Sequence, residues 1–226
     1  MKKQWCITDI DGEFIARMED VLDIYAMPSQ KGVSRICFDE RPCQLIGERI
    51  APLPMKEKHP KKEDYEYVRQ GTCVVLMAYD IDKGQRFLQI RDRRTKKDYA
   101  EFMYWLETNH YTDTNKILLI QDNLNTHKYG AFYERYSADI AHQLKNKIEF
   151  HFTPKHASWL NIMEIEFSAL ARQALNCRIG SVEKLRTISQ AWAEKRNELQ
   201  IKVCWSFTTH IARTKLKRHY DNLLTN

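Results

Sequence analysis

The order of the apolar segments is the feature of this sequence that most restricts its fold. Three strand-like segments follow one another closely, and strand-like and helix-like segments then alternate. The strand-like segments are residues 33–38, 72–79, 86–90, 116–121 and 148–152. The second and third are joined by DIDKGQ, whose Lys83-Gly84 predicts the turn of a β-hairpin. Consecutive strands followed by alternating strands and helices predict an α/β fold, with a mixed sheet and helices on its faces.

The helix-like segments divide the chain into three parts. Residues 12–25 carry apolar side chains at helical spacing and predict an amphipathic helix that docks on another element. Further helices are predicted at 95–110, 129–136, 160–175, 182–199 and 207–220, the last of them rich in Lys and Arg. The charged, proline-containing stretch 42–69 predicts a loop or hairpin. We therefore expect a linker helix in 1–30, the main domain in 31–200 and a basic helical tail in 201–226.

Three carboxylates stand where predicted elements end or begin. Asp39 follows the apolar run VSRICF, Asp122 follows KILLIQ, and Glu164 lies in the predicted helix 160–175. A carboxylate at the carboxyl end of a buried strand is held by rigid backbone while its oxygens face a cleft. Oxygen ligands held in this way suit hard divalent cations. The pattern is typical of a metal-dependent site that cuts phosphodiester bonds.

Each of these carboxylates also has an ordinary structural interpretation. Asp39 could form a turn or cap a helix, and Asp122, in QDNLNTH, could form an Asx turn. Glu164 competes with Glu166, because two positions along a helix rotate a side chain by about 200° and only one can face a given site. We favour Glu164, which lies on a largely apolar helix face where an unpaired carboxylate is costly, and we expect Glu166 to face solvent.

Composition narrows the partners and the compartment. The net charge of +6 and the pI of about 8.9 favour a polyanionic partner such as nucleic acid. The six cysteines contain no CxxC spacing, which predicts reduced core residues rather than a disulfide framework or a zinc site. The longest apolar run, residues 74–79, is far shorter than the roughly 20 residues that span a bilayer. No signal-type segment follows Met1, so we expect a cytoplasmic protein without membrane contact.

The three carboxylates lie, in order, in the segments CFDE, LLIQDNLNTH and FTPKHASWLNIMEIEFSAL. These segments resemble the three catalytic blocks of the DDE transposases of the mariner superfamily, in its bacterial insertion-sequence branch. The resemblance covers nearly the whole chain, including QWC near its start, RRTKKDYAEF and FTTHIARTKLKRHY. It implies an RNase H-like fold for the catalytic domain 31–200, with three antiparallel strands followed by parallel ones. It also implies that Asp39, Asp122 and Glu164 are the catalytic residues and hold two Mg²⁺ or Mn²⁺ ions.

The activity that the resemblance implies is endonucleolytic cleavage and strand transfer of DNA during transposition. Two cations about 3.5–4 Å apart can activate the attacking water or 3′-hydroxyl and stabilise the leaving oxygen, without a covalent protein intermediate. The implied partners are DNA, as transposon ends and as target, and a second copy of the chain, since family members act as dimers on paired ends. The implied location is the bacterial cytoplasm, at the nucleoid.

Basic and polar residues near the acidic blocks are candidates for contacts with DNA. They are Arg91, Arg93, Arg94, Lys96 and Lys97, which form the densest basic cluster, and His127, Lys155, His156 and Asn161 beside the carboxylates. Each has a plainer interpretation. The cluster could be a solvated junction between a strand and a helix, the histidines could be ordinary loop residues, and Asn161 could be a helix N-cap.

The sequence departs from the family pattern in two respects. Family members carry helix-turn-helix modules before the catalytic domain, whereas Trp5 and the helix 12–25 already resemble the joining segment. The usual Pro between Asn161 and Glu164 is replaced by Ile162 and Met163. An alternative function is therefore a truncated transposase that binds DNA or dimerises without cutting. A metal-dependent phosphatase or nuclease of another fold would share the carboxylates but leaves the later blocks unexplained.

Overall fold

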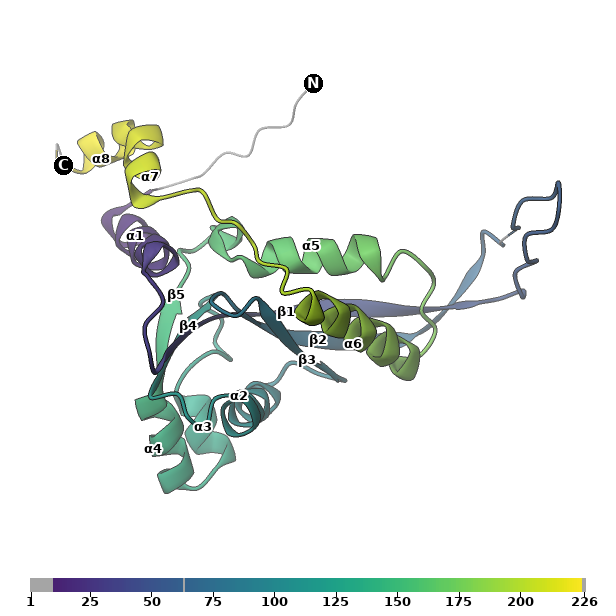
Figure 1. Cartoon of the computed structure of the whole chain (residues 1–226), viewed down its shortest axis with the longest axis horizontal. Coiled ribbons are helices and arrows are strands. Elements are labelled where there is room, and N and C mark those ends of the chain that lie inside the picture. The colour runs from purple at the N-terminus through teal and green to yellow at the C-terminus, as the bar shows by residue number, and fades with distance from the viewer. Residues whose placement is uncertain (1–9, 63, 225–226) are drawn as a thin grey trace.

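The computed structural model describes residues 10–62 and 64–224, and its centre is one five-stranded sheet (Figure 1). The strands are β1 (Val33–Glu48), β2 (Tyr67–Asp80), β3 (Gln85–Arg91), β4 (Lys116–Gln121) and β5 (Ile148–Phe152). Their order in the sheet is β3-β2-β1-β4-β5. Trp5 and the rest of QWC, expected to belong to a joining segment, lie outside the described residues.

The sheet is mixed, as the sequence predicts. β2 pairs antiparallel with both β1 and β3, and β4 pairs parallel with both β1 and β5. The turn between β2 and β3 includes Gly84, whose φ of +67° is a conformation that glycine adopts without steric cost. The predicted order of antiparallel and then parallel strands, and with it the RNase H-like sheet, is confirmed.

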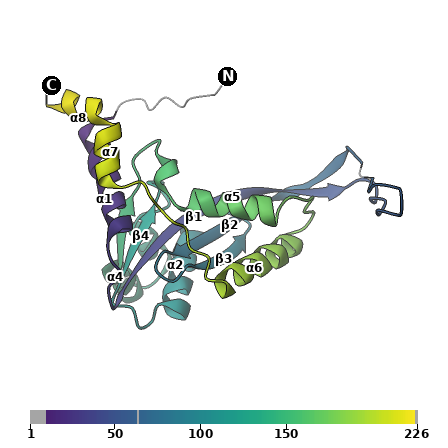
Figure 2. The same ribbon diagram turned by 45° about the horizontal axis from the view of Figure 1, so that its top comes forward.

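β1 is much longer than its predicted range 33–38. It pairs with β4 only from Val33 to Cys37, but it continues beside β2 as far as Glu48. Pro42 is accommodated because β1 has lost β4 at this point and is an edge strand, where a missing N–H is tolerated. Of the two alternatives predicted for 42–69, a loop or a hairpin, the hairpin is confirmed, because residues 46–48 of β1 pair antiparallel with residues 67–69 of β2. β1 and β2 project from the body as a two-stranded arm (Figures 1 and 2).

Helices cover both faces of the sheet, as expected. Val21, Met163 and Trp192, from α1 (Gly12–Ala26), α5 (Met163–Gln173) and α6 (Val182–Glu198), belong to a core on one face. On the other face, Phe102, Phe132 and Leu144 bring in three more helices. These are α2 (Lys96–His110), α3 (Gly130–Arg135) and α4 (Ala138–Lys147). Figure 2 shows α5 and α6 side by side against the sheet.

Two helical regions differ from the sequence prediction. α4 was not predicted, because Ala141 and Leu144 are the buried residues of its ten and leave only a narrow apolar stripe. The predicted tail helix 207–220 is broken into α7 (Thr209–Lys215) and α8 (Lys217–Leu223). No helix among the described residues is both long and apolar enough to cross a membrane.

Candidate active site

Strand register brings Asp39 and Asp122 to equivalent positions on neighbouring strands. Cys37 of β1 is paired with Ile120 of β4 in the last parallel pair, and each aspartate follows two residues later. Asp122 is the first residue beyond β4. Because side chains alternate along a strand, Asp39 points to the same face as Cys37. That face is the one covered by α5. Asp39 therefore lies inside the long β1 and not at its end, but it stands where β1 leaves β4.

Glu164 approaches the same place from the first turn of α5. The helix is tied to β1 by Asn161, whose Nδ2 donates to the carbonyl oxygen of Phe38 at 3.1 Å and lies 3.5 Å from Oδ2 of Asp39. The Asn161 side-chain oxygen in turn accepts from the backbone N–H of Met163 at 3.1 Å. One buried amide thus fixes the start of α5 relative to the first aspartate.

The electrostatics of Asp39 connect it to the other two carboxylates. Burial raises the pKa of Asp39 to about 7, and the negative charges of Asp122, Glu40 and Glu164 add to the rise. The backbone N–H of Glu40, 2.8 Å from Oδ1 of Asp39, opposes it. A cation bound beside Asp39 would offset the negative charges that raise its pKa, so the electrostatics favour cation binding at this point.

The donor chemistry fits a hard divalent ion, since all three side chains offer oxygen. Glu164 is exposed and free to turn about its side-chain bonds. Within residues 10–62 and 64–224, no three His, Cys, Asp or Glu side chains are arranged as a ready-made metal-binding group. The structure therefore brings the expected carboxylates into one electrostatic neighbourhood, without showing a formed metal centre.

Two of the residues expected to contact DNA are instead buried within the fold. His127 is 1% exposed, with Nε2 3.0 Å from Glu40 Oε2 and Nδ1 2.6 Å from Asp122 Oδ1. Burial opposes the charged form of His127, but the contacts with Asp122 and Glu40 outweigh it and raise its pKa to about 9. Asn161 is likewise 1% exposed and already hydrogen-bonded. Both side chains support the site from inside the fold, and their contact with DNA stays a prediction.

Glu40 is the residue of this site that sequence reasoning missed. Its side chain is 3% exposed and faces the side of the sheet opposite to Asp39. A usable signal was present, because strand alternation from Phe38 places Glu40 on a buried apolar face. A carboxylate in that position needs a partner, and His127 is the nearby residue that supplies one.

The expected roles of Glu164 and Glu166 relative to solvent are reversed. Glu166 is fully buried, with its carboxylate 2.7 and 2.8 Å from the guanidinium of Arg86, whereas Glu164 is exposed. The prediction failed because Arg86, eighty positions earlier, provides the partner that makes burial of Glu166 tolerable. Glu164 remains the glutamate whose charge acts on Asp39. It does so from the exposed side of α5 and not, as predicted, from the apolar face of the helix.

The structure divides the predicted basic cluster into two groups. Arg91 pairs with Glu101 at 2.9 Å and Lys96 with Glu134 at 2.6 Å. No ion pair within the described parts of the chain involves Arg93, Arg94 or Lys97, which are all exposed. Arg94 also lines a shallow crevice beside Glu40 and His127. Of the cluster, these three residues are therefore the ones free to meet a phosphate.

Lys155 and His156 are exposed in the loop after β5. With Asn123, Pro154 and residues of α1, they line a cavity of about 420 Å³ next to the loop that carries Asp122. His156 has a φ of +61°, which is uncommon outside glycine. Both residues remain candidates for contact with a substrate that enters from the side of β4 and β5.

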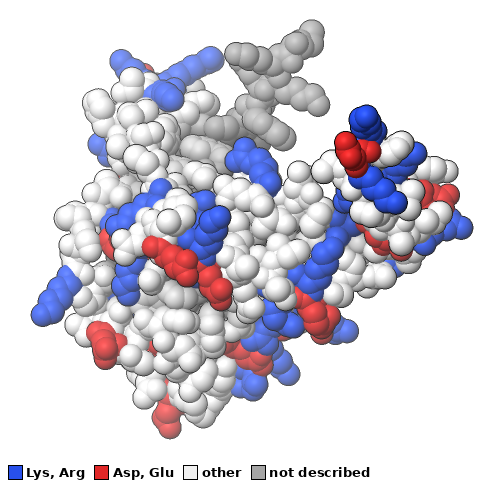
Figure 3. Space-filling model, turned by 45° about the vertical axis from the view of Figure 1, so that its right-hand side comes forward, with Lys and Arg blue, Asp and Glu red and all other residues white. Residues whose placement is uncertain are grey.

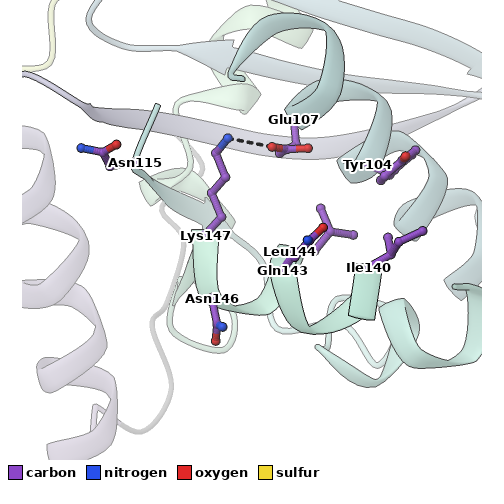
Figure 4. Close-up of a pocket in the computed structure, with 8 residues that line it drawn as sticks. All are labelled: Tyr104, Glu107, Asn115, Ile140, Gln143, Leu144, Asn146 and Lys147. Atoms are coloured by element: carbon purple, nitrogen blue, oxygen red, sulfur yellow. Dashed lines mark hydrogen bonds and ion pairs between the residues drawn. The ribbon is translucent and has the colours of Figure 1, made fainter. Parts of the chain in front are cut away.

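Two other surfaces lack the features of this site. Figure 4 shows a cavity of about 410 Å³ between α2 and α4, where Lys147 Nζ lies 2.7 Å from Glu107 and is thereby neutralised. At the end of the arm, Figure 3 shows Lys and Arg side chains mixed with Asp and Glu. At the first surface the lysine is already paired, and at the second the charges of both signs are interspersed.

Comparison with known proteins identifies the family and supports the fold. A family model described as "DDE superfamily endonuclease" matches residues 34–186, which include all three carboxylates. The comparison with curated proteins gave no match. The fold is similar to that of the Mos1 mariner transposase in three solved structures. For the catalytic domain alone, the TM-score is 0.58 at 12% identity, over 87% of this chain and 89% of that one.

The other two structures are complexes. The paired end complex with Mn gives a TM-score of 0.59 at 13% identity over 88% of this chain, and the strand transfer complex gives 0.57 at 13% identity over 88%. The alignments cover 61% and 63% of those chains, so this chain spans about three fifths of their length. At such identities the likeness establishes a shared fold.

Proposed function

The chain belongs to the DDE superfamily endonucleases, and from this membership we propose that it is the catalytic domain of a transposase that cuts and joins DNA. The proposed catalytic residues are Asp39, Asp122 and Glu164. The observation that carries the proposal is geometric: the pairing of β1 with β4 sets Asp39 beside the strand end that leads into Asp122, and Asn161 ties the start of α5, with Glu164, to β1 next to Asp39. The raised pKa of Asp39 agrees with this arrangement. In three segments far apart in the sequence, the fold has gathered negative charge that a cation would neutralise.

The three carboxylates would hold two Mg²⁺ or Mn²⁺ ions, which would supply Lewis-acid stabilisation of an in-line displacement at phosphorus. Asp39, with a pKa near 7, is partly protonated at neutral pH and would lose its proton when it binds a cation. The exposed Glu164 side chain would turn toward the aspartates. Protonated His127 holds Oδ1 of Asp122, so the other carboxylate oxygen of Asp122 is left for the cation.

We assign DNA binding to the unpaired basic residues around these carboxylates. Arg93, Arg94 and Lys97 are exposed near one side, and Lys155 and His156 near the other. The similar Mos1 structures include a paired-end complex with the left transposon end. By analogy, the partners of this chain would be transposon ends and target DNA, and a second copy of the chain would hold the other end. The three sequence blocks favour a bacterial insertion sequence acting in the cytoplasm.

The domain division expected from the sequence is part of the proposal. The catalytic unit would comprise residues 31–200, with α1 as the linker helix and 201–226 as the tail. In the structure the tail helix α7 lies against α1, and Arg213 makes two contacts of 2.7 Å with Glu19. The linker helix and the tail are thus in contact with each other. Together they would form one unit in which the tail fixes the orientation of α1.

Nicking of supercoiled plasmid DNA tests the function. We expect cleavage with Mn²⁺ or Mg²⁺ and none with EDTA. Asp39→Asn, Asp122→Asn and Glu164→Gln should each reduce the rate by roughly 100-fold or more, the usual effect of removing one group that stabilises developing charge. Asp113→Asn, in an exposed turn before β4, is the matched control and should cut like the wild type. Salt-sensitive DNA binding without any metal-dependent product would instead support the non-cutting alternative.

A further inference from the structure

Arg86, at the start of β3, is a fully buried arginine whose guanidinium donates four hydrogen bonds. Nε and one terminal nitrogen donate to the two carboxylate oxygens of Glu166 at 2.8 and 2.7 Å. The other hydrogen bonds go to the carbonyl oxygens of Gly84 and Ile201, both at 2.6 Å. Both side chains of the ion pair are 0% exposed. A two-pronged arginine–carboxylate contact of this kind fixes orientation as well as distance.

The last turn of α6 and the segment that follows it close over this pair. Asn197 accepts from the backbone N–H of Arg86 at 2.8 Å and donates to its carbonyl oxygen at 2.9 Å, as a neighbouring strand would. Val203 donates its backbone N–H to the hydroxyl of Tyr79 at 2.9 Å. The contact is close, because a Cβ added to Gly84 would lie 2.8 Å from Cγ of Lys202. Residues 197–203 are therefore hydrogen-bonded to β2 and β3 and packed closely against them.

Glu166 also forms an ion pair with Arg196 of α6, whose guanidinium nitrogen lies 3.2 Å from Oε1 of Glu166. Its carboxylate thus connects three elements, namely β3 through Arg86, α6 through Arg196 and α5 through its own backbone. Apart from Glu166, the buried residues of α5 are apolar. Apolar contacts are not directional and permit small rotations or slides of a helix, whereas this ion pair has one geometry.

Glu164 is two residues from Glu166, about 200° away around the helix axis. The rotation of α5 that satisfies Arg86 on the inner side therefore sets where Glu164 emerges on the outer side. We propose that Arg86 and Glu166 are positioning residues for Glu164, and that residues 197–203 brace them. The inference rests on the proposed function of Glu164. It gives a role to residues beyond 186, where the match to the family model ends.

The test replaces the ion pair by apolar side chains of similar length. A buried ion pair exchanged as a whole is often tolerated, whereas loss of one partner leaves an uncompensated charge. The double variant Arg86→Met with Glu166→Met should therefore fold. Arg86→Lys is the second variant, because it keeps a buried cation opposite Glu166 and loses only the fork. Arg186→Met, at an exposed position of α6 without an ion pair among the described residues, is the control.

Three measurements separate positioning from folding. Thermal unfolding reports the fold, electron paramagnetic resonance of free Mn²⁺ reports metal binding without DNA, and plasmid nicking gives kcat and KM. For the double variant we expect Mn²⁺ binding weakened several-fold and kcat reduced by roughly 10- to 100-fold, with KM for DNA unchanged, since small misplacements of a reacting group have effects of this size. Arg86→Lys should shift both quantities in the same direction by less, and Arg186→Met should match the wild type.

The outcomes are distinct. A folded double variant that binds Mn²⁺ and cuts like the wild type overturns the inference. If that variant does not fold, wild-type metal binding and kcat in Arg86→Lys overturn it instead. A wild-type protein that neither binds Mn²⁺ nor cuts DNA rejects the proposed function, and the positioning role falls with it.

Discussion

Nε2 of His127 lies 3.0 Å from Oε2 of Glu40, and both side chains are almost completely buried. The other ring nitrogen faces Asp122, so a single imidazolium lies between the carboxylate of Glu40 in β1 and that of the residue after β4. Glu40 directly follows Asp39 in β1. The acidic site thus has a buried cation of its own, which ties Glu40, within β1, to Asp122, just after β4.

The first prediction concerns the pH dependence of this contact. The folded-state pKa of His127 is about 9, above its ordinary value of 6.5, so its stabilisation is complete below pH 6.5 and is lost as pH rises through 9. His127→Gln should lower the free energy of unfolding by up to about 3 kcal/mol at pH 6, and by much less above pH 9. Urea unfolding at both pH values measures this, with exposed His142→Gln as control. An equal loss at both values would contradict it.

The second prediction concerns Asp39. Its folded-state pKa is near 7, above the ordinary 3.8, so its favourable contribution is complete below pH 3.8 and is lost as pH rises through 7. Asp39→Asn should therefore stabilise the metal-free protein at pH 8, by up to about 4 kcal/mol, while abolishing cleavage. The gain should shrink at pH 5 and when Mn²⁺ stabilises the wild type. Thermal unfolding with and without Mn²⁺ provides the comparison, and a destabilised variant at pH 8 would be the contrary result.

The third prediction separates the two groups in the basic cluster. Each lysine or arginine that neutralises a phosphate contributes about 0.9 to the slope of log affinity against log salt. Replacing Arg93, Arg94 and Lys97 together by Gln should reduce that slope by up to about 3, in a binding titration on random-sequence duplex DNA. Replacing Arg91 and Lys96 should change it by less, because both already pair with glutamates. Equal effects of the two sets would show that the ion pairs open on binding.

The fourth prediction concerns the outer end of the arm, where β1 and β2 meet the loop 49–66. Arg178 pairs with Glu48 at 2.5 Å and donates to the carbonyl oxygens of Glu66, at 2.9 Å, and Asp64. Arg178→Ala should free the loop 49–66 and accelerate tryptic cleavage there several-fold, while changing the unfolding free energy by only about 1 kcal/mol, as for partly exposed pairs. Arg186→Ala, with cleavage at the wild-type rate, is the control. Unchanged cleavage in Arg178→Ala would mean that strand pairing alone holds the arm.

The parts of the fold that local pattern determines were predictable. β4 and β5 have the predicted bounds, because β4 is a short apolar run between polar residues and β5 alternates apolar with polar residues. The apolar run of β4 also predicted correctly that Asp122 follows the end of a strand. Asp39 was found for the same reason, although β1 continues beyond it. Asp39 stands where the pairing of β1 with β4 has ended. The residue pattern of β1 alone does not show where the neighbouring strand stops.

What could not be predicted depends on partners distant in the sequence. Glu166 looks like a solvent-facing residue until Arg86 and Arg196 are brought to it. Glu40 looks like part of a turn until His127 is seen at its side. In each case a buried charge is tolerated only in a pair, and a single segment shows one half of the pair.

The arm and the site share the backbone of β1 without a break. From Asp39 to Glu48 the strand runs for about 30 Å at the usual rise per residue. Its register against β2 shifts between Gln44 and Ile46. At this point the backbone N–H of Ile46 donates to the carbonyl oxygen of Ile179 at 2.8 Å. The segment between α5 and α6 therefore holds the strand where its pairing with β2 is irregular, and it links the arm to the helix that carries Glu164.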